Sequence, residues 1–190
     1  MKKQLANSKL RLLEALAEII KTQGIEEIKI SEVISRAHVS HSTFYRFFQS
    51  KDNFFSWTLT HYLDGLFAFA KHVGQEPEDF YLSYFQYIYN NKVYFQAFNN
   101  SSMWPEFSYK MHEMGIKAYE EFIYLKTGER EVSVIISNYI INAHIGATMA
   151  WLRQSIMIKP SEMASLVYEM TNTALASQNL NLEELFPINN

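Results

Sequence analysis

The feature that most restricts the fold of this chain is a pair of short helical patterns between residues 30 and 48, separated by only three residues. In the first pattern the apolar residues are spaced i, i+3, i+4 and i+7, which places them on one face of a helix. These residues are Ile30, Val33, Ile34 and Ala37. We expect residues 38–40 to form the turn, with Val39 buried and Ser40 capping the second helix by accepting a backbone N–H bond. The arrangement predicts a helix-turn-helix unit.

The second helix begins at His41, and its first turn is polar above an aromatic anchor of Phe44, Phe47 and Phe48. Small hydroxyls and an imidazole at the front of a helix suit the DNA major groove, where base edges and phosphates both require hydrogen bonds. We therefore expect this segment to contact double-stranded operator DNA. The candidate contact residues are Ser31, Ser40, His41, Ser42, Thr43, Tyr45, Arg46 and Lys51.

These residues carry a resemblance to the DNA-binding domain of the TetR/AcrR family of bacterial transcriptional regulators. The family pattern runs from an apolar stripe through a small-residue turn to a Thr-apolar-Tyr core, then to an aromatic residue and a Lys that opens the next helix. The matching residues are Val33 to Ala37, Val39-Ser40, Thr43-Phe44-Tyr45, Phe48 and Lys51. The close match covers about a fifth of the chain, and the rest resembles the family in size and helical pattern.

The chain departs from the family pattern at two positions. His38 stands where the family usually has Gly in the turn, and His is among the residues enriched at positive φ. Lys29 stands where the family usually has a Thr that caps the first helix, so we expect Ser31 to cap it instead. Neither change removes a predicted DNA contact.

The resemblance implies an all-α fold with two domains. Residues 1–51 would form a three-helix DNA-binding domain, and residues 52–190 a helical domain for effector binding and dimerisation. On DNA we expect Thr43, Tyr45 and Lys51 to hold phosphates, while His41 and Ser42 approach base edges and Tyr45 reaches toward a thymine methyl.

The charge distribution is asymmetric in a way that fits this division. Through residue 51 the chain has nine Lys and Arg residues against five Asp and Glu, a balance of +4. The remainder has eight against fifteen, a balance of −7. A positive head on a negative body confines phosphate attraction to one end of the chain.

Composition narrows the function classes. The chain has no Cys, which excludes disulfides, thiolate nucleophiles and cysteine metal sites. The sequence after Lys2-Lys3 is polar, unlike a signal peptide, and no uninterrupted apolar run approaches the roughly 20 residues that span a bilayer. HExxH, GxSxG and glycine-rich phosphate loops are absent, so we expect a cytoplasmic protein that is not an enzyme and has no metal or cofactor.

Helical patterns continue along nearly the whole chain, which has only six Gly and four Pro. A first helix is expected to end near Gly24, in a left-handed stop, with Leu10, Leu13 and Leu16 on its inner face. Pro105 and Pro160 suit first-turn positions. Further helices are expected at 52–72, 78–90, 92–100, 105–125, 130–157 and 160–177.

Aromatic residues are concentrated between Phe80 and Phe98, where nine of nineteen are Phe or Tyr. So many rings cannot all face one tight core, and some are expected to line an effector pocket for an apolar or aromatic small molecule. The alternative is that they are simply core. The candidate pocket residues are Tyr84, Phe85, Phe98, Trp104, Phe107, Met111, Asn138 and Asn142.

The helices expected at 130–157 and 160–177 have more apolar surface than one neighbour can cover. The resemblance implies that these two helices of each subunit form a two-fold, four-helix interface in a homodimer. The candidate interface residues are Ile145, Met149, Leu152, Met163, Leu166, Val167 and Met170. The alternative is that both helices only close the core of the monomer.

These observations favour a ligand-responsive transcriptional regulator, a repressor, that binds a palindromic operator as a dimer. Two alternatives stay open at this point. The chain could act as a co-activator or adaptor through a protein or metabolite partner, or as a metabolite-binding or catalytic body with a vestigial DNA-binding head.

Overall fold

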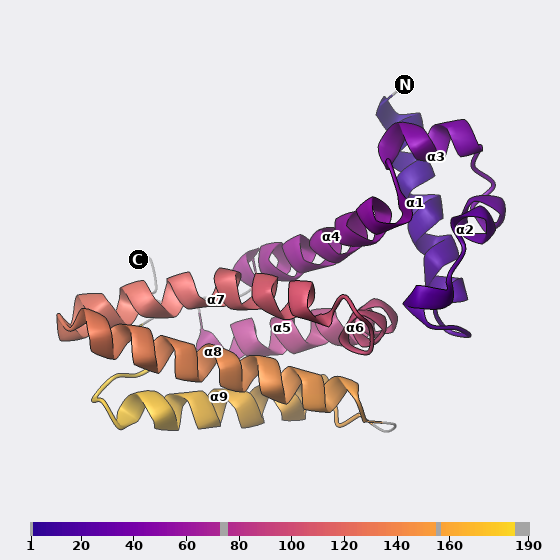
Figure 1. The fold of residues 1–190 in the computed structure, drawn as a ribbon. Coiled ribbons are helices and arrows are strands. Elements are labelled where there is room, and N and C mark those ends of the chain that lie inside the picture. The colour runs from indigo at the N-terminus through magenta and orange to yellow at the C-terminus, as the bar shows by residue number, and fades with distance from the viewer. Residues whose placement is uncertain (1, 73–75, 155–156, 185–190) are drawn as a thin grey trace. The chain divides into compact units, whose positions relative to one another are not determined.

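The computed structural model describes residues 2–72, 76–154 and 157–184, and the regular elements in these ranges are all helical (Figure 1). The elements are α1 (Lys2–Ile19), a 3-10 turn η1 (Ile25–Glu27), α2 (Ile30–Arg36), α3 (His41–Phe47), α4 (Lys51–His72), α5 (Pro77–Asn90), α6 (Lys92–Asn99), α7 (Trp104–Thr127), α8 (Arg130–Leu152) and α9 (Pro160–Ala176). The predicted all-α fold is confirmed. Pro105 and Pro160 both lie in first turns, as expected.

Two predicted helix ends are wrong. Helix α8 ends at Leu152 and not at residue 157, and residues 155–156 lie outside the described part. Helix α1 ends at Ile19, and Gly24 has a φ of −68°, so it precedes η1 in extended conformation and is not a left-handed stop. The inner face of α1 is also shifted, because Leu10 is 54% exposed while Leu12 and Leu16 are fully buried.

The chain divides into two compact units that differ from the predicted domains. Unit 1 contains the residues up to Tyr62 together with Val93–Trp104, and unit 2 contains Leu63–Lys92 and the residues from Pro105 onward. Unit 1 thus extends past residue 51, the predicted end of the DNA-binding domain, and that boundary stays a prediction. The head includes the first part of α4 and most of α6.

Helix α6 and the loop after it are tied to the head by two hydrogen bonds across long sequence separations. The buried Tyr94 hydroxyl donates to the backbone oxygen of Leu13 over 2.6 Å. The backbone N–H of Ser102 donates to Glu26 Oε1 over 2.7 Å, and this bond lowers the pKa of the Glu26 carboxyl. These contacts explain why Val93–Trp104 belongs to unit 1.

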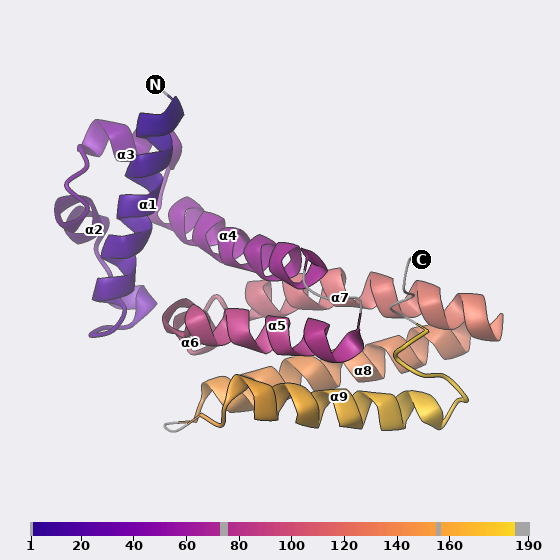
Figure 2. The same cartoon turned by 180° about the vertical axis from the view of Figure 1, so that it is seen from behind.

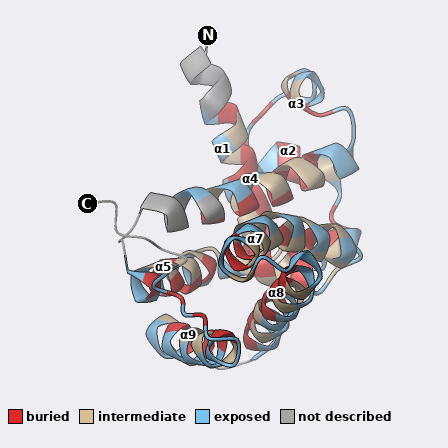
Figure 3. Ribbon diagram, turned by 90° about the vertical axis from the view of Figure 1, so that its left-hand side faces the viewer, coloured by how far each residue is buried: buried red, intermediate tan, exposed pale blue. Residues whose placement is uncertain are grey.

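Unit 2 is a bundle in which α5, α7, α8 and α9 run beside one another (Figures 1 and 2). Figure 3 looks along these helices and shows buried residues on their facing sides and exposed residues outside. Phe85, Phe107 and Ile140 are each about 1% exposed. Helix α7 approaches α8 closely at Gly115, where a Cβ would lie 2.6 Å from Ile141 Cδ1.

The Tyr94 hydrogen bond gives a first test of the fold. Replacing Tyr94 by Phe keeps the buried ring but removes the donor to Leu13, so we expect the free energy of unfolding to fall by about 1 kcal/mol in urea titrations. Tyr89→Phe is the matched control, because the Tyr89 side chain is 36% exposed. Equal stability of Tyr94→Phe and the natural protein would contradict the proposed role of this bond.

Candidate nucleic-acid interface

The turn between α2 and α3 is built on a left-handed residue, His38, whose φ is 50°. The N–H of His38 donates to Ser35 O over 3.1 Å and that of Val39 donates to Ile34 O over 3.2 Å, which is the paired pattern of a Schellman motif. Val39 is 8% exposed. The expectations that His38 accepts a positive φ and that Val39 is buried are both confirmed.

The start of α2 differs from the prediction. Helix α2 begins at Ile30 with Lys29 as its N-cap, and no side chain caps it. Ser31 therefore does not cap the helix, because it already lies within the first turn, where its hydroxyl is exposed. It remains a candidate DNA contact.

Ser40 caps α3 as predicted. Its hydroxyl oxygen accepts the backbone N–H of Thr43 over 3.1 Å and its hydroxyl donates to Thr43 Oγ1 over 2.9 Å. The cap orders the first turn of α3, where His41 and Ser42 are exposed.

Aromatic packing fixes the inner side of α3. Phe44 is fully buried, and its ring centroid lies 5.3 Å from that of Phe48 and 5.6 Å from that of Phe54, at the start of α4. The Lys9 ammonium lies 5.5 Å from the Phe48 centroid and 4.7 Å from that of Trp57, so α1 closes this cluster with a cation–π contact.

The outer side of α3 carries polar groups. Ser42, Tyr45 and Arg46 are exposed, and the helical spacing places Ser42 and Arg46 opposite Phe44 and Tyr45 beside it. Tyr45 is 55% exposed although its ring edge contacts Phe44. Thr43 is half-buried. The local structure therefore presents hydrogen-bonding side chains on one flank and buries Phe44 and Phe48, whereas Phe47 of the predicted anchor is only half-buried.

Lys51 is only half-exposed at the start of α4. Its Nζ donates to the backbone oxygen of Glu26 over 2.7 Å and lies 5.5 Å from the Phe55 ring centroid. An ammonium has three N–H donors, so this bond positions the group and leaves two for another acceptor.

Sequence reasoning missed two residues that shape this surface. Arg11 Nη1 donates to His38 O over 3.2 Å and so ties α1 to the turn. Lys29 is exposed at the start of α2. Both residues were counted in the positive charge of the first 51 residues, but neither was assigned a role. Arg11 and His38 are 27 residues apart, so no local sequence pattern indicates the hydrogen bond between them.

The predicted effector residues are divided between the two units. Phe85, Phe107 and Met111 are buried in unit 2, whereas Phe98 and Trp104 belong to unit 1. Tyr84 is half-buried. Asn138 Nδ2 donates to Val134 O, and Asn142 is exposed with its Nδ2 donating to Asn138 O.

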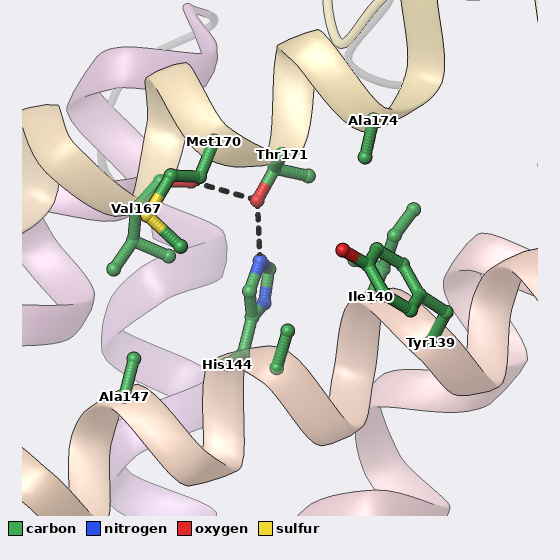
Figure 4. A pocket seen from close by; sticks show the side chains of 9 residues that line it. Tyr139, Ile140, His144, Ala147, Val167, Met170, Thr171 and Ala174 are labelled. Carbon is green, nitrogen blue, oxygen red and sulfur yellow. Dashed lines mark hydrogen bonds between the residues drawn. The ribbon is translucent and has the colours of Figure 1, made fainter. Parts of the chain in front are cut away.

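A small hollow of about 30 Å³ lies between α8 and α9. It is lined by none of the predicted effector residues, but by Val167 and Met170 of the predicted dimer interface. In Figure 4 His144 reaches from α8 toward Thr171 on α9, with Tyr139 and Met170 at the sides. Burial lowers the pKa of His144 to about 4, so its imidazole is neutral near pH 7. The lining is otherwise mainly apolar and small.

The predicted dimer residues divide by burial. Ile145, Leu152, Met163 and Val167 are buried inside unit 2, so they stabilise the protomer and present no surface to a partner. Met149 is half-buried. Leu166 and Met170 are 49% and 52% exposed. The exposed apolar surface of α8 lies instead at Val134, Ile135 and Tyr139.

By length and composition alone, α8 is the one helix in the described ranges that could cross a membrane. Core helices of soluble proteins meet the same criteria. Residues 132–152 contain no Asp, Glu, Lys or Arg, which accounts for this result.

Comparison with protein families identifies both parts of the chain. Residues 12–56 match the family described as "Bacterial regulatory proteins, tetR family", and residues 75–173, more than half of the chain, match a "Transcriptional regulator C-terminal region". The chain belongs to the TetR family. It is therefore a DNA-binding transcriptional regulator and not an enzyme.

A curated helix-turn-helix relative is similar over part of its length. It is an uncharacterised HTH-type transcriptional regulator, YdgC of Bacillus subtilis (strain 168), 35% identical over 60 residues. The match spans 32% of this chain and 31% of that relative.

Solved structures share the TetR fold over nearly the whole chain. The dihydroxyacetone kinase operon activator DhaS is 14% identical with a TM-score of 0.68, covering 92% of this chain and 98% of that one. A TerR/AcrR-family regulator from Aquifex aeolicus VF5 is 18% identical with a TM-score of 0.66, covering 86% and 96%. A TetR regulator from Streptococcus agalactiae 2603V is 15% identical with a TM-score of 0.64, covering 90% and 96%.

The positive φ of His38 provides a test of the turn between α2 and α3. Glycine has no Cβ and adopts positive φ without strain, so His38→Gly should raise the free energy of unfolding by about 1 kcal/mol in urea titrations. His38→Ala keeps the Cβ and should give no such gain. The same increase in both variants would show that relief of backbone strain is not the cause.

Proposed function

We propose that this TetR-family protein is a cytoplasmic, ligand-responsive repressor that binds a palindromic operator as a homodimer. The DNA-binding part of the proposal rests on the outer flank of α3, where Ser42, Tyr45 and Arg46 are exposed while Phe44 is buried. Thr43, Tyr45 and Lys51 hold phosphates in this proposal, and His41 and Ser42 approach base edges. The positive balance of the first 51 residues supports it.

The proposed homodimer uses exposed apolar side chains of α8 and α9. Ile135 and Tyr139 on α8 are 69% and 66% exposed, and Leu166 and Met170 on α9 are about half exposed. Large apolar side chains that cluster at this exposure favour a partner surface. Two-fold symmetry would then place two α3 helices about one DNA turn apart, or a multiple of it, on a palindromic site.

The proposed response to ligand passes through α4. This helix begins in unit 1 and continues into unit 2 after Tyr62, so the two units share one continuous helix. A ligand that binds one of two arrangements of unit 2 more tightly increases the population of that arrangement at the expense of the other. In the arrangement favoured by ligand, a changed spacing of the two α3 helices weakens operator binding.

The direct test is selection of bound sequences from a random DNA pool at low salt, followed by a reporter assay with the selected site. A palindromic consensus and lower reporter expression support the proposal. Higher expression makes the protein an activator, and a blank selection with capture of one defined protein partner supports the adaptor alternative.

Lys51→Ala tests the phosphate contacts. We expect weaker binding to every DNA sequence, and a slope of log affinity against log salt that is smaller by about two for the dimer, because one phosphate contact is lost from each of its two bound heads. Fluorescence anisotropy over a salt series measures both quantities. Lys110→Ala removes a charge from α7 in unit 2 and is the control. An unchanged slope in Lys51→Ala would exclude a phosphate contact there.

A second variant tests the homodimer. Leu166→Glu/Met170→Glu places charges on the exposed apolar face of α9, so we expect sedimentation to show monomers and binding to the two-half-site operator to weaken by at least about tenfold. The control is Leu125→Glu on α7, where the side chain is 72% exposed. If the α9 variant sediments as a dimer, the interface lies elsewhere.

A further inference from the structure

Three segments of unit 1 meet at Glu26, which lies in η1. The backbone oxygen of Glu26 accepts a hydrogen bond from Lys51 Nζ, at the start of α4, over 2.7 Å. Its side-chain Oε1 accepts the backbone N–H of Ser102, in the loop between α6 and α7, over 2.7 Å. Lys51 and Ser102 are 25 and 76 residues from Glu26 in the sequence. One residue therefore connects a candidate DNA contact to a distant loop, and these three residues are called the Glu26 junction.

The turn that carries Glu26 is short and is held by buried neighbours. Ile25 and Ile28, before and after Glu26, are 4% and 2% exposed. Two backbone hydrogen bonds, of 3.1 and 3.3 Å, close the turn. Hydrogen bonds of a 3-10 turn have poorer geometry than those of an α-helix. The position of the backbone oxygen that holds Lys51 therefore depends also on contacts outside the turn, and the bond from Ser102 is such a contact.

The loop that contains Ser102 is firmly based. Helix α6, which precedes it, has Phe95 and Phe98 at most 1% exposed, and its Tyr94 hydroxyl donates to α1. Other N–H groups of this segment donate within α6 and the loop itself, and they belong to Asn100, Ser101, Met103 and Trp104. The N–H of Ser102 donates to the Glu26 carboxylate. This bond therefore fixes Glu26 to a well-packed part of unit 1.

The Glu26 junction holds the Lys51 ammonium before any DNA is present. Its Nζ is bonded to the Glu26 oxygen and lies 5.5 Å from the Phe55 ring centroid. A free lysine side chain has many rotamers, and ordering it when DNA binds would reduce affinity. The bond to Glu26 uses one of three N–H donors, so the ammonium is oriented while two donors stay available for phosphate oxygens.

The charge of Glu26 should act on DNA binding in the opposite direction. The bond from the Ser102 N–H lowers the pKa of the Glu26 carboxyl, and the charge of Lys51 lowers it further, so Glu26 is negative near neutral pH. A negative side chain near a phosphate contact repels DNA. If charge were its only influence, replacing Glu26 by a neutral residue would strengthen DNA binding. Geometry and charge therefore predict effects of opposite sign.

We propose that Glu26 is a positioning residue for DNA binding, through which the loop between α6 and α7 holds Lys51 in the orientation that contacts phosphate. The carboxylate fixes η1 to Ser102, and η1 fixes the ammonium through the Glu26 backbone oxygen. The assignment rests on the proposed function, in which Lys51 binds a phosphate. It adds this loop, which leads into unit 2 at Pro105, to the parts of the chain that determine DNA affinity.

Two substitutions of Glu26 test the positioning role. Glu26→Ala removes the acceptor for Ser102 but keeps the backbone oxygen that holds Lys51, and Glu26→Gln keeps an acceptor without the charge. Fluorescence anisotropy measures the affinity of the full-length protein for a random-sequence DNA duplex at low salt, because phosphate contacts do not depend on sequence. We expect Glu26→Ala to bind at least about threefold more weakly than the natural protein. Glu26→Gln should bind within about twofold of the natural protein, or more tightly.

Glu27→Ala is the matched control. Glu27 lies in the same turn, its side chain is exposed, and its replacement changes the net charge by the same amount. We expect this variant to bind DNA as tightly as the natural protein, or more tightly.

A double-mutant cycle separates positioning of Lys51 from a general structural role. If Glu26 acts through Lys51, Glu26→Ala should cause no further loss of affinity in a Lys51→Ala background. A general loss of stability or a distortion of the head would instead lower the affinity by the same factor in both backgrounds.

Four results would overturn the assignment. They are unchanged or tighter binding by Glu26→Ala, an equal loss in Glu26→Gln, an equal loss in Glu27→Ala, and the same effect of Glu26→Ala in both backgrounds. If Lys51→Ala weakens binding and Glu26→Ala does not, the positioning role fails while the proposed phosphate contact stands. If Lys51→Ala leaves the affinity unchanged, the phosphate contact itself fails, and the positioning role fails with it.

Discussion

Helix α3 has only seven residues, and helices shorter than about 12 residues are marginal in water, so packing must hold it in place. The contact that does so is the burial of Phe44 against Phe48 and Phe54, with ring centroids 5.3 and 5.6 Å away. Each buried Phe contributes about 1.5–3 kcal/mol. The same contact joins α3 to the start of α4, and it turns Ser42, Tyr45 and Arg46 outward.

Local sequence signals predicted most of this head. Helical spacing located α2, Ser40 was recognised as a cap, and His38 was recognised as a residue that accepts positive φ. Two of the places where the sequence-based expectations failed are the start of α2 and the α6 segment. Ser31 was taken as a cap because its hydroxyl suits one, yet the helix starts a residue earlier, at Ile30. The α6 segment joined the head through Tyr94, 81 residues from its acceptor, and no local pattern reports such a contact.

The candidate sites in unit 2 were harder to predict because aromatic composition does not distinguish a core from a cavity. Phe85 and Phe107 are closely packed core residues, although their density suggested a pocket. Polar residues of four helices form a hydrogen-bonded group inside unit 2, namely Tyr81, Tyr119, His144 and Thr171. They lie up to 90 residues apart in the sequence, so only the fold shows that they meet. Likewise, apolar spacing on α8 and α9 could not separate the buried Val167 from the exposed Met170.

The discontinuity of unit 1 has a consequence for biosynthesis. Because Val93–Trp104 completes the head, a nascent chain that has emerged only through Tyr62 lacks the hydroxyl of Tyr94 and the backbone of Ser102 that bind Leu13 and Glu26. The N-terminal helices must therefore wait for forty further residues, Leu63 to Ser102, to be translated before these contacts form. During synthesis, unit 1 can therefore be completed only after part of unit 2 has left the ribosome.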